Sequence, residues 1–248
     1  MPRYFIELSY NGTRFFGWQR QPQEARYPSV QGSLEAAFST VLQKKIDIIG
    51  CGRTDTGVHA KQYFAHFDFE HAIPNNILSK LNKILGKDIF VQRIFEVSDE
   101  MHARFSAISR SYEYHIGFQK NPFRSETAFF YPYASLLEVP KMQAAAQLLM
   151  QYSDFSTFCK TGTSVKTNIC CLTRSEWIFD EAQQNLTYHV SSDRFLRGMI
   201  RLIVGMCINV GTQKIQLSEV QNALDTQTSL KKPLSVPPQG LFLTDICY

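Results

Sequence analysis

The segment of residues 52–60 carries the residue types best suited to chemistry. Its sequence is Gly-Arg-Thr-Asp-Thr-Gly-Val-His-Ala, so Arg53 and Asp55 lie between two glycines. If the segment is extended, Arg53 and Asp55 point the same way, because side chains alternate along a strand. The Arg53 guanidinium would then lower the pKa of the Asp55 carboxyl and keep it ionised at neutral pH. Such a carboxylate suits nucleophilic or base chemistry at a sugar carbon, with no metal needed.

An ordinary surface turn explains the same residues. Asp and Gly are common in turns, and an exposed Arg–Asp pair stabilises a protein very little. The pattern around Asp55 therefore leaves both interpretations open. His59 is four residues away, but a histidine at the start of a strand is usually there to hydrogen-bond a loop. We interpret Cys51 as a small buried apolar group.

Hydrophobic spacing predicts the elements that position this segment. The predicted strands are residues 3–10, 63–69, 89–97, 110–118, 172–179, 186–190 and 241–246. The predicted helices are residues 30–42, 138–150, 195–210 and 218–224, with a further helical segment after Pro74. Ser29 is the expected N-cap of the first helix, and Ser218 with Gln221 the expected capping box of the last. The alternation in 63–69 predicts one buried face, and Arg197 and Arg201 are expected one turn apart on one helix face.

Strands and helices mix in both halves of the chain, with connections too short for a doubly wound fold throughout. We therefore expect an α+β fold, in which two similar halves form a shared, mostly antiparallel sheet flanked by helices. The expected halves are residues 1–107, which carry the Asp55 segment, and residues 108–248, which complete an active-site cleft between them.

Composition limits the class of protein. Of 248 residues, 44% are apolar and 19% charged, which is typical of a soluble globular chain. The net charge of +4 is mild and compatible with a local basic groove. The six cysteines form no C-x-x-C pair, and neither a signal segment nor a long apolar run is present. We expect a cytoplasmic protein with free thiols and no membrane segment.

Several stretches together resemble one family. Residues 52–60 resemble the signature of the TruA family of tRNA pseudouridine synthases, and residues 10–21 (Tyr-Asn-Gly-Thr-Arg-Phe-Phe-Gly-Trp-Gln-Arg-Gln) look like its N-terminal motif. Further similar stretches follow in the family's order: 29–31 (Ser-Val-Gln), 102–107 (His-Ala-Arg-Phe-Ser-Ala), 110–114 (Arg-Ser-Tyr-Glu-Tyr), 195–201 (Phe-Leu-Arg-Gly-Met-Ile-Arg) and 240–243 (Gly-Leu-Phe-Leu). The resemblance covers nearly the whole chain. Thr56 and Gly198 depart from it, since Ala and a bulkier residue are usual there.

The resemblance implies isomerisation of uridine to pseudouridine at positions 38, 39 and 40 of tRNA, without a cofactor and in a homodimer. By position, Asp55 is the catalytic carboxylate, Arg53 helps turn the target nucleotide out of its stack, and Arg201 pairs with the carboxylate. Tyr112 packs on the target base and Leu241 lines its pocket. The other candidates for RNA contact are Arg14, Arg20, Arg104, Arg110 and Lys166. Trp18 is expected to pack rather than to bind RNA, and Phe105 and Tyr114 are expected in the core.

Two rival functions remain. A non-catalytic RNA-binding protein on the same fold would bind RNA without needing Asp55. A glycoside hydrolase could use Asp55 as its nucleophile, but such enzymes normally need a second carboxylate as acid. The matching motifs offer no such Asp or Glu partner.

Overall fold

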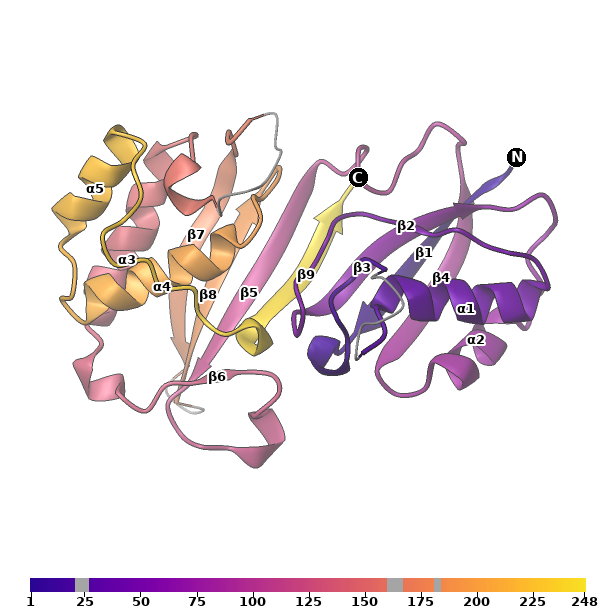
Figure 1. Cartoon of the computed structure of the whole chain (residues 1–248), viewed down its shortest axis with the longest axis horizontal. Helices are drawn as coiled ribbons and strands as arrows, with labels where there is room; N and C mark the ends of the chain where they lie inside the picture. Colours follow the sequence, from indigo (N-terminus) through magenta and orange to yellow (C-terminus); the bar gives the residue numbers. More distant parts are fainter. Residues whose placement is uncertain (21–26, 160–166, 181–183) are drawn as a thin grey trace. The chain divides into compact units, whose positions relative to one another are not determined.

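A computed structural model describes residues 1–20, 27–159, 167–180 and 184–248 (Figure 1). Helices and strands alternate irregularly along the chain, and the predicted α+β class is confirmed. The chain divides into two compact units. The first unit holds residues 1–108 and 242–248, and the second holds residues 109–241. The last seven residues, which we had placed with the C-terminal half, therefore return to the first unit.

Three long antiparallel strands form the sheet of the first unit: β1 (Arg3–Tyr10), β3 (His59–Asp68) and β4 (Ile89–Val97). β1 lies in the middle, and Ile6 is paired with Ala65 on one side and with Ile94 on the other. β3 is also joined by two short partners, β2 (Ile49–Gly50) antiparallel and β9 (Leu241–Cys247) parallel through Phe242 and Leu243.

Two helices accompany this sheet, α1 (Val30–Leu42) and α2 (Ile77–Leu85). The predicted cap of α1 is confirmed, because the Ser29 hydroxyl accepts from the Gly32 N–H at 3.1 Å. α2 packs against both α1 and β4. Its presence agrees with the helical pattern that follows Pro74.

The expectation of one buried face on β3 is wrong. Phe64 and His66 are 5% and 2% exposed, as well buried as the alternating residues between them. Phe67 packs edge-on against Phe38 of α1, whereas the Phe64 ring meets Tyr248 at 5.3 Å. β3 is covered on both faces, because a distant segment of the chain lies over the face that the pattern left exposed.

The second unit contains three antiparallel strands, in the order β5 (Ser109–Gly117), β8 (Asn185–Ser192) and β7 (Leu172–Asp180). The short β6 (Phe129–Phe130) runs parallel to the end of β5. The helices are α3 (Val139–Leu148), α4 (Met199–Gly211) and α5 (Leu217–Asp225). α3 packs on β7, α4 and α5, so it connects the sheet of this unit to its other helices.

Two predictions at helix starts are corrected. α4 begins at Met199 instead of Phe195, because Gly198 is its N-cap with a φ of +72°, a left-handed conformation that stops the helix. Arg197 therefore precedes the helix and does not share a face with Arg201. The capping box of α5 is formed by Gln216 and Glu219, two residues earlier than expected.

Candidate active site

Asp55 lies in the loop of residues 52–58 between β2 and β3. The Val58 N–H donates to the Asp55 carbonyl oxygen at 3.1 Å, and Gly57 between them has a φ of +77°. This is a four-residue turn whose third residue needs the positive φ that Gly adopts freely. Arg53 is exposed and Asp55 half-buried. The turn interpretation describes the backbone here, while the effect of the Arg53 guanidinium on the Asp55 carboxyl stays a prediction.

Residues of the N-terminal motif hold the backbone just before Asp55. The Trp18 N–H donates to the Thr54 carbonyl at 3.2 Å, and the Tyr10 and Thr54 hydroxyls share a buried hydrogen bond of 2.8 Å. Gly17 has a φ of +79°, and a Cβ there would lie 2.4 Å from the Thr54 carbonyl oxygen. Only a residue without a side chain permits this approach. The motif therefore positions the Asp55 loop from one side.

Residues of β3 hold the start of this loop and the neighbouring Gly12 segment. The buried His59 accepts the Gly12 N–H on Nδ1 at 3.1 Å, and its ring stacks on Phe242 at 4.5 Å. The Tyr63 hydroxyl donates to the Gly52 carbonyl at 2.6 Å. His59 thus hydrogen-bonds a loop, as predicted. The supporting roles of Tyr10, Gly17 and Tyr63 were missed, because no local pattern marks a contact between distant segments.

Trp18 is a packing residue, as expected. It is 3% exposed, and its ring stacks on Tyr63 with centroids 4.0 Å apart. Cys51 is 1% exposed, which fits its interpretation as a small buried group. The core beneath the loop is therefore closely packed by aromatic rings.

A basic hollow of about 150 Å³ opens beside the loop. Arg53 and Arg104 both line it, and none of its described lining residues is acidic. The remaining lining residues are Trp18, Gln19, Gln31, Ile48, Ile49, Gly50 and Gly52. Because two guanidinium groups and no described acidic residue line this hollow, it is favourable for a phosphate or another anion.

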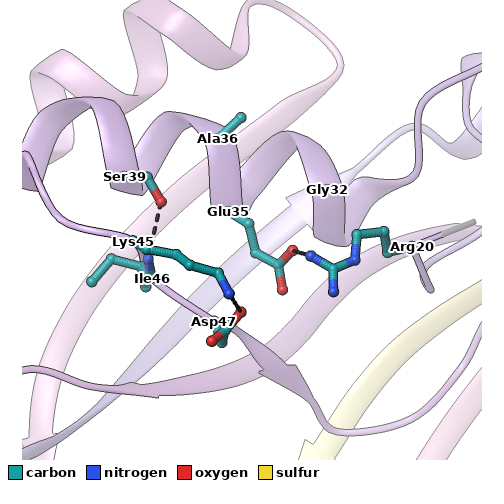
Figure 2. Close-up of a pocket in the computed structure, with 8 residues that line it drawn as sticks. All are labelled: Arg20, Gly32, Glu35, Ala36, Ser39, Lys45, Ile46 and Asp47. Atoms are coloured by element: carbon teal, nitrogen blue, oxygen red, sulfur yellow. Dashed lines mark hydrogen bonds and ion pairs between the residues drawn. The ribbon is translucent and has the colours of Figure 1, made fainter. Parts of the chain in front are cut away.

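Arg14 and Arg20 have carboxylate partners. Arg14 pairs with Asp88 at 3.0 Å, and Arg20 pairs with Glu35 of α1 at 3.3 Å. Figure 2 shows the second pair on the wall of a hollow of about 250 Å³, together with the Lys45–Asp47 pair. Two cations face two carboxylates there, so this hollow has less attraction for an anion than the one beside Asp55.

In the second unit, Tyr112 lies on β5, half-buried and paired with Val190 of β8. The Phe195 ring meets Tyr112 edge-on at 5.2 Å and 82°, which fixes the plane of the phenol ring. Arg110, two residues before it on the same strand, donates to the Asp193 carbonyl at 2.8 Å. Tyr112 is thus positioned both by its strand and by the segment that precedes α4.

Arg201 lies in the first turn of α4, and its Nε donates to the Val236 carbonyl at 2.7 Å. The buried Tyr114 donates to the next carbonyl, that of Pro237, at 2.8 Å. Burial raises the pKa of Tyr114 far above its ordinary value, so the hydroxyl keeps the proton that it donates. These two bonds fix the segment that leads to Leu241, which is 7% exposed. Tyr114 is a core residue, as expected.

Phe105 was expected in the core, but it is 76% exposed. Lys166 lies outside the described residues. Arg53, Asp55, Arg14, Arg20 and Arg104 belong to the first unit, and Tyr112, Arg110, Arg201 and Leu241 to the second.

The described residues contain no group of three or more His, Cys, Asp or Glu side chains able to hold a metal ion. Among the helices in the described ranges, none has the length and apolar character needed to cross a membrane.

Known proteins resemble this chain along its whole length. The sequence profile of the tRNA pseudouridine synthase family matches residues 8–106 and 145–248. A tRNA pseudouridine synthase A of Azobacteroides pseudotrichonymphae is 42% identical, over 100% of this chain and 97% of the relative. That of Porphyromonas gingivalis is 39% identical over 100% and 98%. A tRNA pseudouridine synthase A 2 of Clostridium perfringens is 34% identical over 98% of each chain. The chain belongs to the tRNA pseudouridine synthase family.

Proposed function

We propose that this protein isomerises uridine to pseudouridine at positions 38, 39 and 40 in the anticodon arm of tRNA, with Asp55 as the reacting carboxylate. The observation that carries the proposal is the loop of residues 52–58. Its backbone is held at Thr54 by Tyr10, Gly17 and Trp18 and at Gly52 by Tyr63. Asp55 is half-buried, and Arg53, two residues before it, lines a basic hollow. A fixed carboxylate next to an anion-attracting surface suits a phosphodiester substrate.

The chemistry needs one carboxylate and no net gain or loss of atoms. The bond from uracil N1 to the sugar C1′ breaks with its electrons going to the base. The base turns, C5 bonds to C1′, and the proton on C5 is replaced by one on N1. Asp55 either attacks C1′ and is later expelled, or removes the 2′ proton to form a glycal that is reprotonated afterwards. Both routes begin with an ionised carboxylate.

The second unit supplies the groups that hold the base. Tyr112 offers a ring face whose plane is fixed by Phe195, and Leu241 offers an apolar wall. Arg201 is the proposed cationic partner of the carboxylate. Its guanidinium is restrained through the Val236 carbonyl, which reduces the entropy lost when it binds. Arg110, anchored on Asp193, is a proposed phosphate contact.

The target base must leave its stack, at a cost of a few kcal/mol. Arg53 is exposed on the hollow next to Asp55 and is the proposed residue that stabilises the displaced nucleotide. Arg14, Arg20 and Arg104 are proposed to contact the backbone of the same tRNA. The proposal includes a homodimer in the cytoplasm, as the family resemblance implies.

The test maps pseudouridine along the anticodon arm of an unmodified tRNA transcript. Wild-type protein is compared with Asp55→Ala and with Asp47→Ala, which removes an exposed carboxylate elsewhere in the same unit. We expect product from the wild type and Asp47→Ala only, with tRNA still bound by folded Asp55→Ala.

Product from Asp55→Ala would remove Asp55 from the mechanism. If no protein forms product although tRNA binds, the protein is a non-catalytic RNA-binding module instead. Product outside positions 38–40 would contradict the proposed site on the tRNA.

A further inference from the structure

The turn of residues 102–106 presents an aromatic ring to solvent. Phe105 is 76% exposed at its tip, and the Arg104 guanidinium lies over the ring at 5.6 Å from the centroid. Leaving the apolar surface of a phenylalanine in water costs free energy. Ala103, two residues earlier in the same turn, is 0% exposed. The turn thus has one anchored residue and one ring that faces outward.

The turn is held closely by its own first side chain. The His102 Nδ1 accepts the N–H groups of Arg104 and Phe105 at 3.1 and 3.3 Å. The Ser106 N–H donates to the His102 carbonyl at 2.9 Å, and the Ser106 hydroxyl accepts the His102 N–H at 2.9 Å. The His102 ring also lies 4.4 Å from that of Phe105. These contacts fix the ring of Phe105 before any ligand arrives.

The base of the turn is anchored in the sheet. The Ala103 N–H donates to Nδ1 of His66 on β3 at 3.1 Å, and the Tyr248 hydroxyl donates to the Ala103 carbonyl at 2.7 Å. Burial, and to a lesser extent the charge of Arg3, lower the pKa of His66 to about 4. Burial and then Arg3 also lower the pKa of His102. Both imidazoles are therefore neutral at physiological pH and able to accept these hydrogen bonds.

The surroundings of the turn favour a nucleic acid. Arg104 lines the same hollow as Arg53, two residues before Asp55, and the described lining of that hollow has no acidic residue. Proteins that bind single-stranded nucleic acid combine a basic surface with exposed aromatic rings on which bases stack. The Phe105 ring and the two arginines provide this combination on one unit.

From these observations we propose that Phe105 is a stacking platform for an unpaired nucleobase of the bound tRNA, that Arg104 contacts the phosphate next to that base, and that His102 is a positioning residue for both. This inference rests on the proposed tRNA substrate. It assigns to the 102–106 turn a base-binding site distinct from the pocket of the target uridine, and the occupant is an RNA nucleotide in the single-stranded anticodon loop.

The test measures Kd for an unmodified anticodon stem-loop at several salt concentrations. Phe105→Ala should raise Kd about 10-fold or more, since stacking is lost. Phe105→Leu should behave like Phe105→Ala, and Phe105→Trp should stay within about 3-fold of wild type. The control is Phe123→Ala, which removes a 97% exposed ring from the other unit and should leave Kd unchanged.

Salt dependence separates the two contacts. Phe105→Ala should keep the wild-type slope of log K against log salt, whereas Arg104→Ala should reduce its magnitude by about 1. His102→Ala should weaken binding like Phe105→Ala, with Tm close to that of wild type. His102→Asn should bind the stem-loop more tightly than His102→Ala and close to wild type, because an Asn oxygen can accept the same backbone N–H groups.

The inference fails if Phe105→Ala binds the stem-loop as wild type does, if Phe105→Leu retains full affinity, or if Phe123→Ala weakens binding equally. A changed oligomeric state of Phe105→Ala in light scattering, with unchanged Kd, would identify a contact between copies of the chain instead. The proposed function is judged separately, by pseudouridine formation in the wild type.

Discussion

Gly17→Ala should damage the reaction without touching the substrate. The new Cβ would lie 2.4 Å from the Thr54 carbonyl oxygen and 3.1 Å from the Asp55 carbonyl carbon. Ordinary contacts begin at 3.4 Å, so the Thr54–Asp55 backbone must move by about 1 Å. A displacement of about 1 Å at a reacting group costs on the order of 10²-fold in rate. We therefore expect kcat to fall about 100-fold.

The matched control is Gly86→Ala. Gly86 also has a positive φ, of +70°, but a Cβ there would meet nothing within 4 Å. It therefore measures the cost of a glycine-only backbone conformation alone, since its ψ is −146°. That cost is about 1–3 kcal/mol, or roughly 2–12 °C in Tm. Turnover by Gly86→Ala should equal that of wild type, while Gly17→Ala should lose more stability because its clash adds to the backbone cost.

The assay follows tritium release from uridine labelled at C5, since that hydrogen is lost when C5 bonds to the sugar. Saturating tRNA gives kcat, and thermal unfolding gives Tm for each variant. If folded Gly17→Ala retains wild-type kcat and loses no more Tm than Gly86→Ala, the N-terminal motif does not position Asp55. Equal loss of turnover in both variants would show that general destabilisation is the cause.

Three further predictions concern Tyr10 and Trp18 beside this loop and His66 beneath the 102–106 turn. Tyr10→Phe removes a buried hydrogen bond to the Thr54 hydroxyl and should cost about 0.5–1.5 kcal/mol with a lower kcat. Tyr152→Phe, which removes an exposed bond to Asp225, should leave kcat unchanged, and an equal effect of both would contradict the reasoning. Trp18→Ala should cost about 3–5 kcal/mol in denaturant unfolding; weaker tRNA binding without lost stability would make Trp18 a contact surface instead. The pKa of His66 is about 4 when folded, below its ordinary 6.5, so the unfolded chain binds this proton first as pH falls. Stability should therefore decrease from pH 6.5 to about 4, by at most about 1.4 kcal/mol per pH unit for this group. His66→Asn should flatten that decrease, and identical pH profiles of wild type and variant would refute the assignment.

The periodicity of the sequence was a reliable guide to local elements. β1 and α1 begin and end at the predicted residues, and the Ser29 cap is formed as expected. These features depend on residues a few positions apart, so the chain encodes them locally. The start of α4 was misjudged because the apolar residues before Gly198 continue the helical pattern, while the glycine adopts a backbone conformation that ends it.

Burial was harder to predict wherever distant segments cover one another. Phe64 and His66 follow a pattern typical of a half-exposed strand, yet they are covered by Tyr248 and His102. Phe105 is an apolar residue of a type usually found in the core, but it is exposed. Its turn is anchored to the sheet through Ala103 and not through Phe105. The hydrophobicity of a residue indicates how favourable its burial would be. Whether the residue is buried depends on which other segment of the chain packs over it.

The sequence by itself determined the family, and it singled out Asp55 as the proposed reacting carboxylate. Which groups hold that carboxylate was decided by the tertiary structure alone. Tyr10 meets Thr54 across 44 residues of sequence, and it does so because β1 and β3 pair in a register that joins Tyr10 to Ala60. Hydrogen bonds and close backbone approaches of this kind depend on distances between strands. A pattern of residue types along one strand does not contain those distances.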